Sequence, residues 1–433
     1  MVDWIVNFII QIIFFFVPFV GTGILGYMTW KIWIHYIQQD FIAGIDWVLL
    51  EIVPPREVLR SPKAMELFIS NALYHMSDKG GVEEFWQGAV WFWFSLEIAS
   101  IEGQVHFYIR VPSRIKTLVE TQMYAQYPQA QVKVAEDYTL AVDEISPRSA
   151  WNLWGCEFDL TKPEAYPIKT YVDFGLDKDP KEEFKVDPIS SVVELFSSIG
   201  KGEQMWSQIV ITVPKKTYKI PGTWFGTRDW VEEAKEEINR MLKPYTSTKD
   251  VKEGDSRSRI EVRVPDFMKD PVAGVSHKIS KIGFETGVRI CYVAKKEAFN
   301  MSNRRNMRLI WRQYESPLLN GFKRINSTQA DAFGTNFIKT WFLLPEKTIT
   351  RLKNRMLHEY REREFFHPPL RHKVWIPWPF TVYFFPTYFH HHTYVLNIEE
   401  LATVWHFPGQ ILKVPTLERI ESKEASPPTN LPT

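Results

Sequence analysis

Three successive histidines, His390, His391 and His392, are the residues of this chain best suited to metal chemistry, because imidazole is a common metal ligand. Consecutive side chains of an extended segment point to opposite faces, and no carboxylate or cysteine stands at ligand spacing beside the run. The two cysteines, Cys156 and Cys291, exclude a four-cysteine site and a disulfide framework. The sequence therefore predicts no metal ion, and an enzyme that uses the histidine run is the weakest of three hypotheses.

Two glycine-containing segments resemble nucleotide-binding loops without meeting their requirements. GTGILG, Gly21–Gly26, matches the dinucleotide pattern GxGxxG, but it lies inside an apolar stretch and follows no strand. The segment around Gly200 and Lys201 lacks the first glycine of a phosphate loop and the Ser or Thr after the lysine. GxSxG and HExxH motifs are absent from the sequence. We therefore predict no catalytic residue and no cofactor.

The strongest local charge signal is a basic stripe near position 310. A helix predicted over Ser302 to Tyr314 has Met307, Ile310 and Trp311 on one face and arginines beside them. The stripe consists of Arg304, Arg305, Arg308, Arg312, Lys323 and Arg324. It could contact anionic lipid headgroups or nucleic-acid phosphates, although a solvated helix face is the commoner explanation. The formal net charge of +1 favours neither partner, so nucleic acid stays an open alternative.

The N-terminal stretch predicts a transmembrane helix that would position everything else. From Trp4 to Trp30 no side chain is charged, and at ~1.5 Å per residue the helix would be longer than the ~30 Å hydrocarbon core. The expected anchor residues are Trp4, Pro18, Tyr27, Trp30, Lys31 and Trp33, with a bend at the proline and aromatic side chains at both interfaces. Because Lys31 begins a basic C-terminal flank, we expect a single-pass inner-membrane protein with a cytoplasmic body. A buried core helix is the alternative.

The body shows one order of elements twice. The first pass contains, in chain order, a strand at Asp46–Val53, a helix after Ser61, a hairpin at Trp91–Val111, a helix after Ser113 and a strand at Gln131–Ala135. The second pass has strands at Glu157–Leu160, Gln204–Val213, Gly287–Ala294 and Phe322–Ile325, and helices after Asp187 and at Ser302–Tyr314. This βαββαβ order predicts an α+β chain with two ferredoxin-like modules.

The expected organisation follows from these elements. Residues 1–40 form the anchor and a juxtamembrane helix, 41–150 the first module and 151–330 the second, with an insertion at 214–280 that contains a helix at Asp229–Leu242. Residues 331–413 form a helical and aromatic C-terminal extension, and 414–433 a proline-rich tail.

Four segments resemble an uncharacterised bacterial family, frequent in candidate-phyla bacteria. They are FSLEIASIEGQVHFYIRVPSRIKTLVETQMYAQYP (94–128), AYPIKTYVDFG (165–175), GEQMWSQIVI (202–211) and LNIEELATVWHFP (396–408). Members are membrane-anchored proteins associated with hexameric ATPases of type IV secretion or conjugation-like systems. The similarity extends from about Trp47 to the end, and in longer relatives a similar proline-rich linker leads into a P-loop motor domain. The resemblance implies the part that precedes the motor, with the ATPase as a separate polypeptide.

We therefore expect a non-catalytic, membrane-anchored adaptor for a P-loop ATPase, which could guide DNA or protein substrate and form a homo-oligomer. The predicted docking element is a helix at Asn397–Trp405, with Glu399, Glu400, Leu401, Val404 and Trp405, although packing on the chain's own core is an equal alternative. The second hypothesis is a membrane-surface scaffold that binds anionic lipid and partner proteins without any motor.

Overall fold

The protein is described here by a computed structural model. It describes residues 2–55, 60–74, 80–177, 187–214, 218–219, 227–249, 259–262, 264–328, 346–367 and 391–409. The chain divides into two units. Unit 1 contains Met1–Asp46, Met76–Trp91 and His367–Pro386, and unit 2 contains Trp47–His75, Phe92–Phe366 and Thr387–Thr433.

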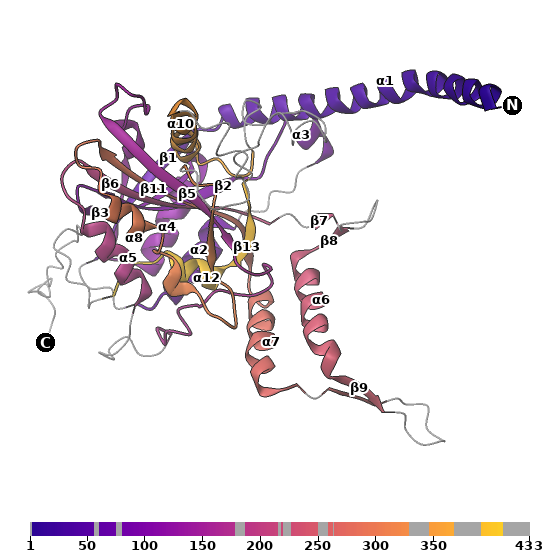
Figure 1. The fold of residues 1–433 in the computed structure, drawn as a ribbon. Helices are drawn as coiled ribbons and strands as arrows, with labels where there is room; N and C mark the ends of the chain where they lie inside the picture. The colour runs from indigo at the N-terminus through magenta and orange to yellow at the C-terminus, as the bar shows by residue number, and fades with distance from the viewer. Residues whose placement is uncertain are drawn as a thin grey trace, which may run out of the picture. The chain divides into compact units, whose positions relative to one another are not determined.

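Unit 1 is built on one long helix, α1 (Val2–Ala43), with Pro18 inside it (Figure 1). The short helix α3 (Gly81–Phe85) lies beside α1, where the ring of Trp30 contacts Phe85 and that of Trp33 contacts Trp86. Gly88 follows with φ +68°, and a Cβ there would lie 2.3 Å from the carbonyl oxygen of Ile37. Glycine is therefore needed at this close approach.

The predicted transmembrane anchor is wrong. No helix in the described part of the chain combines the length and the apolar character needed to cross a membrane. In the part of α1 whose side chains are described, Gly21, Thr22, Gly23 and Gly26 lower the mean hydropathy, and Lys31 follows within the same helix. The single-pass inner-membrane localisation, which depended on this anchor, is corrected with it, whereas contact with a membrane as partner stays a prediction.

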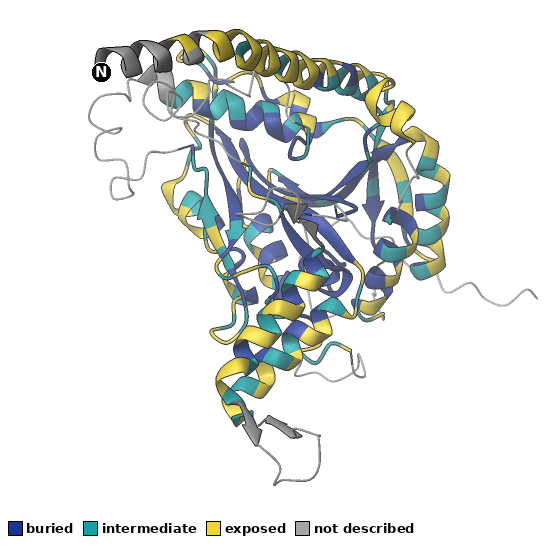
Figure 2. Cartoon of the chain, turned by 90° about the vertical axis from the view of Figure 1, so that its right-hand side faces the viewer, coloured by how far each residue is buried: buried dark blue, intermediate teal, exposed yellow. Residues whose placement is uncertain are grey.

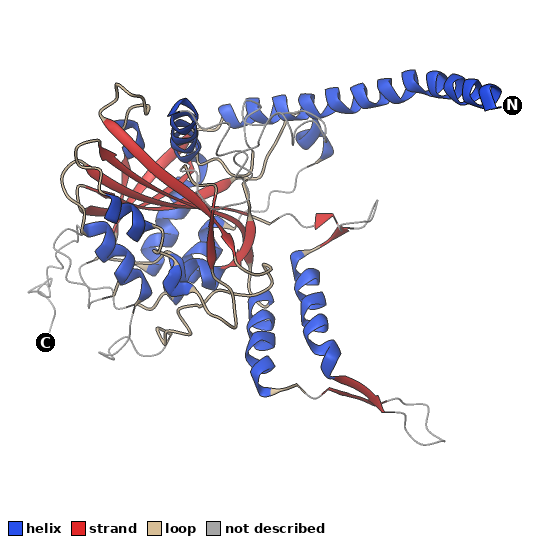
Figure 3. Ribbon diagram, in the orientation of Figure 1, coloured by secondary structure: helices blue, strands red, loops and turns tan. Residues whose placement is uncertain are grey.

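Unit 2 contains a nine-stranded antiparallel sheet (Figures 1 and 3). Its strands are β1 (Trp47–Val53), β2 (Trp93–Ile101), β3 (Gln104–Pro112), β4 (Gln131–Ala135), β5 (Trp151–Leu160), β6 (Glu203–Thr212), β11 (Gly283–Lys295), β12 (Phe322–Ile325) and β13 (Tyr394–Asn397). The order is β12-β5-β11-β6-β2-β3-β1-β4, and β13 pairs with the start of β11. The chain is thus α+β.

The prediction of two ferredoxin-like modules is wrong, because the strands form one sheet. β2 pairs with β6 from Trp93 opposite Thr212 to Ile101 opposite Gln204. All of β6, and all of β2 except its last residue, is buried. Two separate modules would have exposed these long apolar edges, which join here instead. β13, from the predicted C-terminal extension, also belongs to this sheet.

The helices cover the two faces of the sheet differently. One face, which we call the apolar face, is covered by α2 (Lys63–Leu73), α4 (Lys116–Gln126), α5 (Pro188–Ser197), α8 (Met301–Met307) and α12 (Ile398–Val404) (Figures 1 and 3). Its contacts include the ring pair Phe107–Trp405 and the hydrogen bond from Ser100 Oγ to the carbonyl of Phe196. The opposite face, the charged face, lies under the 3-10 helix η2 (Tyr138–Ala141) and α10 (Glu346–Glu362). The strands between are mostly buried (Figure 2).

The insertion between β6 and β11 contributes two helices, α6 (Trp230–Leu242) and α7 (Asp266–Ile279), which pack together through Ala234, Met241 and Val275. β9 (Thr246–Lys249) pairs with β10 (Arg259–Val262), and β7 (Tyr218–Lys219) pairs with β8 (Thr227–Arg228). The predicted helix at Asp229–Leu242 is confirmed as α6, with Asp229 as its N-cap. The predicted helix at Ser302–Tyr314 is shorter: α8 ends at Met307, and the 3-10 helix η4 (Arg312–Tyr314) follows.

Candidate functional site

Four polar side chains form a row across the charged face. Glu157 of β5 stands opposite Arg289 of β11, Arg289 opposite Gln208 of β6, and Gln208 opposite Glu97 of β2. Residues directly opposite each other in paired strands project from the same face of the sheet. All four residues are fully buried, although each belongs to a strand whose other residues are mainly apolar. The row therefore places charge inside the core rather than at a strand end.

Hydrogen bonds connect the row without a break. Arg289 donates to Glu157 Oε1 from Nη2 at 2.7 Å and from Nε at 3.2 Å, and its Nη1 donates to Gln208 Oε1 at 3.4 Å. Gln208 Nε2 donates to Glu97 Oε1 at 3.1 Å and to the carbonyl of Tyr360 at 2.9 Å. Each of the four side chains of the row thus has a hydrogen-bond partner, which a polar group in low-dielectric surroundings requires.

Arg363 closes the row at its Glu97 end. Its Nε donates to Glu97 Oε1 at 2.9 Å, and its Nη2 donates to Asp137 Oδ1 at 3.3 Å. Arg363 follows α10 directly and has φ +55°, a left-handed conformation that is unfavourable for a residue with a side chain. Its two carboxylate partners explain why an arginine is held where a helix end commonly has glycine.

Burial and the charges of the row shift pKa values within the row and next to it. Burial alone would raise the pKa of Glu157, but the charge of Arg289 and the hydrogen bond from His391 lower it to about 2. Burial lowers the pKa of Arg110, at the same end of the row as Arg363, to about 9, and the like charge of Arg363 adds to this effect. Burial raises the pKa of the Cys291 thiol, so this cysteine does not have the thiolate character of a nucleophile.

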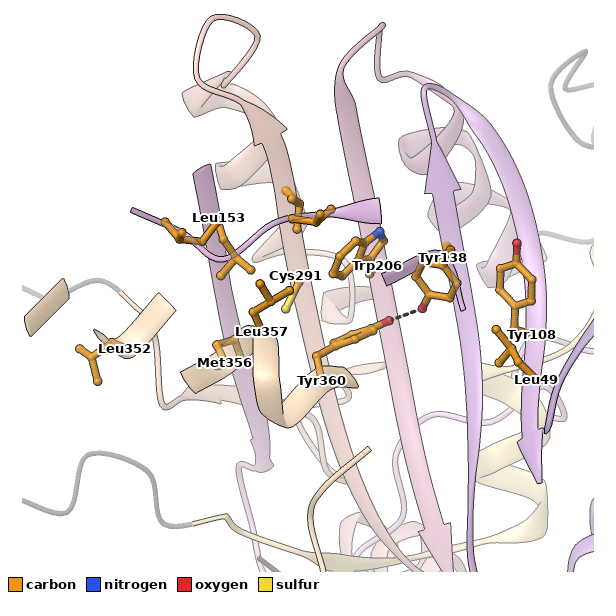
Figure 4. Close-up of a cluster of buried hydrophobic side chains, with 14 residues drawn as sticks. Leu49, Tyr108, Tyr138, Leu153, Trp206, Cys291, Leu352, Met356, Leu357 and Tyr360 are labelled. Atoms are coloured by element: carbon orange, nitrogen blue, oxygen red, sulfur yellow. Dashed lines mark hydrogen bonds between the residues drawn. The ribbon is translucent and has the colours of Figure 1, made fainter. Parts of the chain in front are cut away.

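An apolar and aromatic cluster, drawn in Figure 4, adjoins the row on the charged face. It contains Leu49, Ala99, Tyr108, Tyr138, Val142, Ile145, Leu153, Trp206, Cys291, Val293, Leu352, Met356, Leu357 and Tyr360. Tyr138 OH donates to Glu97 Oε2 at 2.8 Å and lies 2.9 Å from Tyr360 OH, the pair joined by the dashed line in Figure 4. α10 and η2 therefore exclude water from the row with their apolar side chains and bond to it with their hydroxyls.

Three distant segments meet at the Glu157 end of the row. His391, which precedes β13, has its Nδ1 atom 2.9 Å from Glu157 Oε1 and its Nε2 atom 3.7 Å from Glu359 Oε1 of α10. Asn326 Nδ2 donates to Glu157 Oε2 at 2.8 Å. The three side chains His391, Glu157 and Glu359 each offer a ligand atom, and these atoms lie within 4.8 Å of one another. Imidazole and carboxylate are ligands for divalent metal ions.

Sequence reasoning missed this junction. Glu157 and His391 are 234 positions apart, so no local spacing rule could have paired them. The one available signal was the type of residue: Glu97, Glu157 and Arg289 are charged residues inside largely apolar strands, where a buried charge needs a partner. His390 lies outside the described residues, and His392 is exposed, with Nδ1 3.8 Å from Asp159.

The predicted basic stripe lies elsewhere. Arg305 and Arg312 are exposed, and Arg304, Arg308 and Arg324 are partly buried on α8, in the turn after it and on β12. Lys323 is exposed, with Nζ 3.0 Å from Asp159 Oδ2. The structure does not bring these side chains to the charged row, and contact with nucleic-acid phosphates stays a prediction.

The predicted docking residues are buried in the chain's own core. Glu399, Glu400, Leu401, Val404 and Trp405 are each at most 2% exposed. Glu400 pairs with the buried Lys278 of α7 at 3.1 Å, and Trp405 Nε1 donates to the backbone carbonyl of Glu97. Packing of this helix on the chain's own core is the alternative that the sequence left open. Of the predicted anchor residues, Pro18, Tyr27, Trp30, Lys31 and Trp33 lie on α1, and the side chain of Trp4 is outside the described residues.

Comparison with known families places the sheet within one of them. Residues 47–330, from β1 to just past β12, match the family described as a domain of unknown function, DUF8128. The chain belongs to this family. The match includes Glu97, Glu157, Gln208 and Arg289, whereas Glu359, Arg363 and His391 lie beyond it. No curated protein matches the chain.

Proposed function

We propose that this protein is a docking subunit, without catalysis of its own, for a separate P-loop ATPase of the type IV secretion or conjugation-like kind. The observation that carries the docking role is the apolar surface of α1. Phe15, Phe19 and Leu25 are 64–66% exposed, and several neighbours are exposed with them (Figure 2). Contiguous exposed apolar side chains of this extent mark interaction sites. The identity of the partner rests on the family resemblance.

The charged face supports the non-catalytic part of this proposal. The ionic groups from Glu157 to Asp137 bond to one another under α10 and η2. A network of this kind rigidifies a core and specifies one arrangement of strands. A rigid sheet is what a docking subunit requires in order to hold a partner in a fixed orientation.

The proposal is tested by co-purification from the native host. The tagged full chain is crosslinked in cells and purified, and the proteins recovered in fixed ratio are identified by mass spectrometry. A triple variant, Phe15→Ser, Phe19→Ser and Leu25→Ser, is compared with a control of three exposed leucines in unit 2, Leu67→Ser, Leu140→Ser and Leu318→Ser.

We expect the wild type and the control to recover a P-loop ATPase, and the α1 variant to lose at least about tenfold of it, because a few large apolar side chains carry most of the binding energy of an interface and about 1.4 kcal/mol in total corresponds to tenfold. Failure of the wild type to recover any ATPase would refute the partner. Equal recovery by the α1 variant and the control would refute α1 as the docking surface.

A further inference from the structure

The side chain of His391 has one nitrogen engaged and one nitrogen unpaired. Its side chain is 7% exposed, and Nδ1 lies 2.9 Å from Glu157 Oε1. Glu157 Oε1 also accepts two hydrogen bonds from Arg289, so it acts as an acceptor towards His391, and the proton of a neutral imidazole is on Nδ1. Nε2 then presents a lone pair. It is buried and has no hydrogen-bond partner among the described residues, a rare and unfavourable state.

The unpaired Nε2 faces a second carboxylate at a distance that suits an ion between them. Glu359 Oε1 is 3.7 Å away, which is too long for a hydrogen bond. Two ligands that bind one metal ion at about 2.0–2.1 Å with tetrahedral geometry are separated by roughly 3.4 Å. Only a small movement of either side chain would produce that separation.

We propose that His391 Nε2 and the Glu359 carboxylate bind a divalent first-row transition metal ion, with Glu157 holding the imidazole through Nδ1. A metal-bound histidine commonly donates its other nitrogen to a carboxylate, which fixes the tautomer and orients the ring. Glu157 has this relation to His391, and its near oxygen belongs to the same group of ligand atoms. An imidazole with carboxylates suits Zn²⁺, Mn²⁺ or Fe²⁺ better than Mg²⁺ or Ca²⁺.

The arginines around the site affect how tightly it would bind a metal ion. Arg355 Nε lies 2.5 Å from Glu359 Oε1, and Arg289 Nη2 lies 3.8 Å from Glu359 Oε2. These cations favour the ionised carboxylates that a metal ion requires, but they also compete with it for the same oxygens. We therefore expect reversible binding that chelators remove, rather than a structural ion on which folding depends. The ion would connect β5, α10 and the residues before β13, independently of the α1 surface.

The test uses the full chain with a histidine-free tag, treated with chelator, dialysed, and then supplied with Zn²⁺, Mn²⁺ or Mg²⁺ alone. We expect about one Zn²⁺ per chain by elemental analysis, little Mg²⁺, and a higher unfolding midpoint with Zn²⁺. His391→Asn keeps a donor for Glu157 but removes the Nε2 lone pair, and should abolish both effects. His392→Ala, at the exposed neighbouring histidine, is the matched control and should retain them.

Two outcomes would overturn the site. The first is Zn²⁺ content well below one per chain in the wild type, or equal content in wild type and His391→Asn when circular dichroism shows that both are folded. The second is an unfolding midpoint that Zn²⁺ does not change in the folded wild type. Recovery of an ATPase is a separate measurement and does not enter this test.

Discussion

The two faces of the sheet in unit 2 are made by the same strands but are held by different forces. On the apolar face, the side chains of Ile98, Ile209 and Ile290 are fully buried. One position earlier on the same strands, Glu97, Gln208 and Arg289 form the charged row on the other face. Apolar contact is non-directional, whereas ion pairs and hydrogen bonds have fixed geometry. The apolar face thus supplies non-directional stability, whereas the charged face specifies how the strands align.

Strand register shows why this separation matters. A slip of two residues between β11 and β5 would place a different apolar side chain on the apolar face, where the loss of packing energy is moderate. On the charged face the same slip would move Arg289 away from Glu157 and break a buried ion pair, which costs several kcal/mol. The charged row therefore excludes misaligned pairings that the apolar face would tolerate.

The largest expected difference between the faces comes from adjacent residues of β11. Arg289→Met should lower the free energy of unfolding by about 3–5 kcal/mol, because it leaves Glu157 buried without its cation. Ile290→Val, the matched substitution on the apolar face, should cost about 0.5–1.5 kcal/mol. Urea unfolding at neutral pH measures both. Equal losses would mean that the charged row contributes nothing beyond ordinary packing.

Acidification should weaken the charged face selectively. The pKa of Glu157 is about 2 in the folded chain against an ordinary 4.5, so its contribution is present above about pH 4.5 and is lost as the pH falls towards 2. The difference of the two pKa values corresponds to roughly 3 kcal/mol. Unfolding free energies at about pH 5 and about pH 2 should therefore differ more for the wild type than for Glu157→Gln.

An exposed carboxylate provides the control for this pH dependence. Glu236→Gln on α6 removes a carboxylate that lies at the surface, away from the row. It should leave the pH dependence of the wild type nearly unchanged, since surface charges contribute little. A Glu157→Gln variant that lost as much stability on acidification as the wild type would show that Glu157 is not stabilised by its neighbours.

Local sequence signals predicted elements of both faces but not their assembly. Asp187 and Asp229 cap the helices expected after them, and the hairpin expected at Trp91–Val111 is present as β2 and β3. Strands β2 and β6, in contrast, are buried on both faces, so their hydrophobicity shows that they have partners without showing which. The pairing of Glu157 with Arg289, Asn326 and His391 depends on that assembly, and a single sequence does not record it.

The smallest expected effect concerns close packing next to the charged row. Gly287 lies two residues before Arg289 on β11, and a Cβ there would be 2.3 Å from the ring of Phe365, which also lies under the Arg289 guanidinium at 4.3 Å. Gly287→Ala should therefore displace the ring and cost about 1–3 kcal/mol of unfolding free energy. At Gly200 the nearest atom to an added Cβ is 3.6 Å away, so Gly200→Ala should change stability by less than about 1 kcal/mol.

Urea unfolding of these two glycine variants decides whether the charged face needs both its charges and its packing. If Gly287→Ala is as stable as Gly200→Ala, Phe365 moves without penalty, and the cation–π contact with Arg289 contributes little. If Gly287→Ala loses the expected stability, the Arg289 guanidinium is fixed from two directions, by the hydrogen bond to Glu157 and by the ring of Phe365 beneath it. The charged face would then hold Arg289 in one position, which its role in alignment requires.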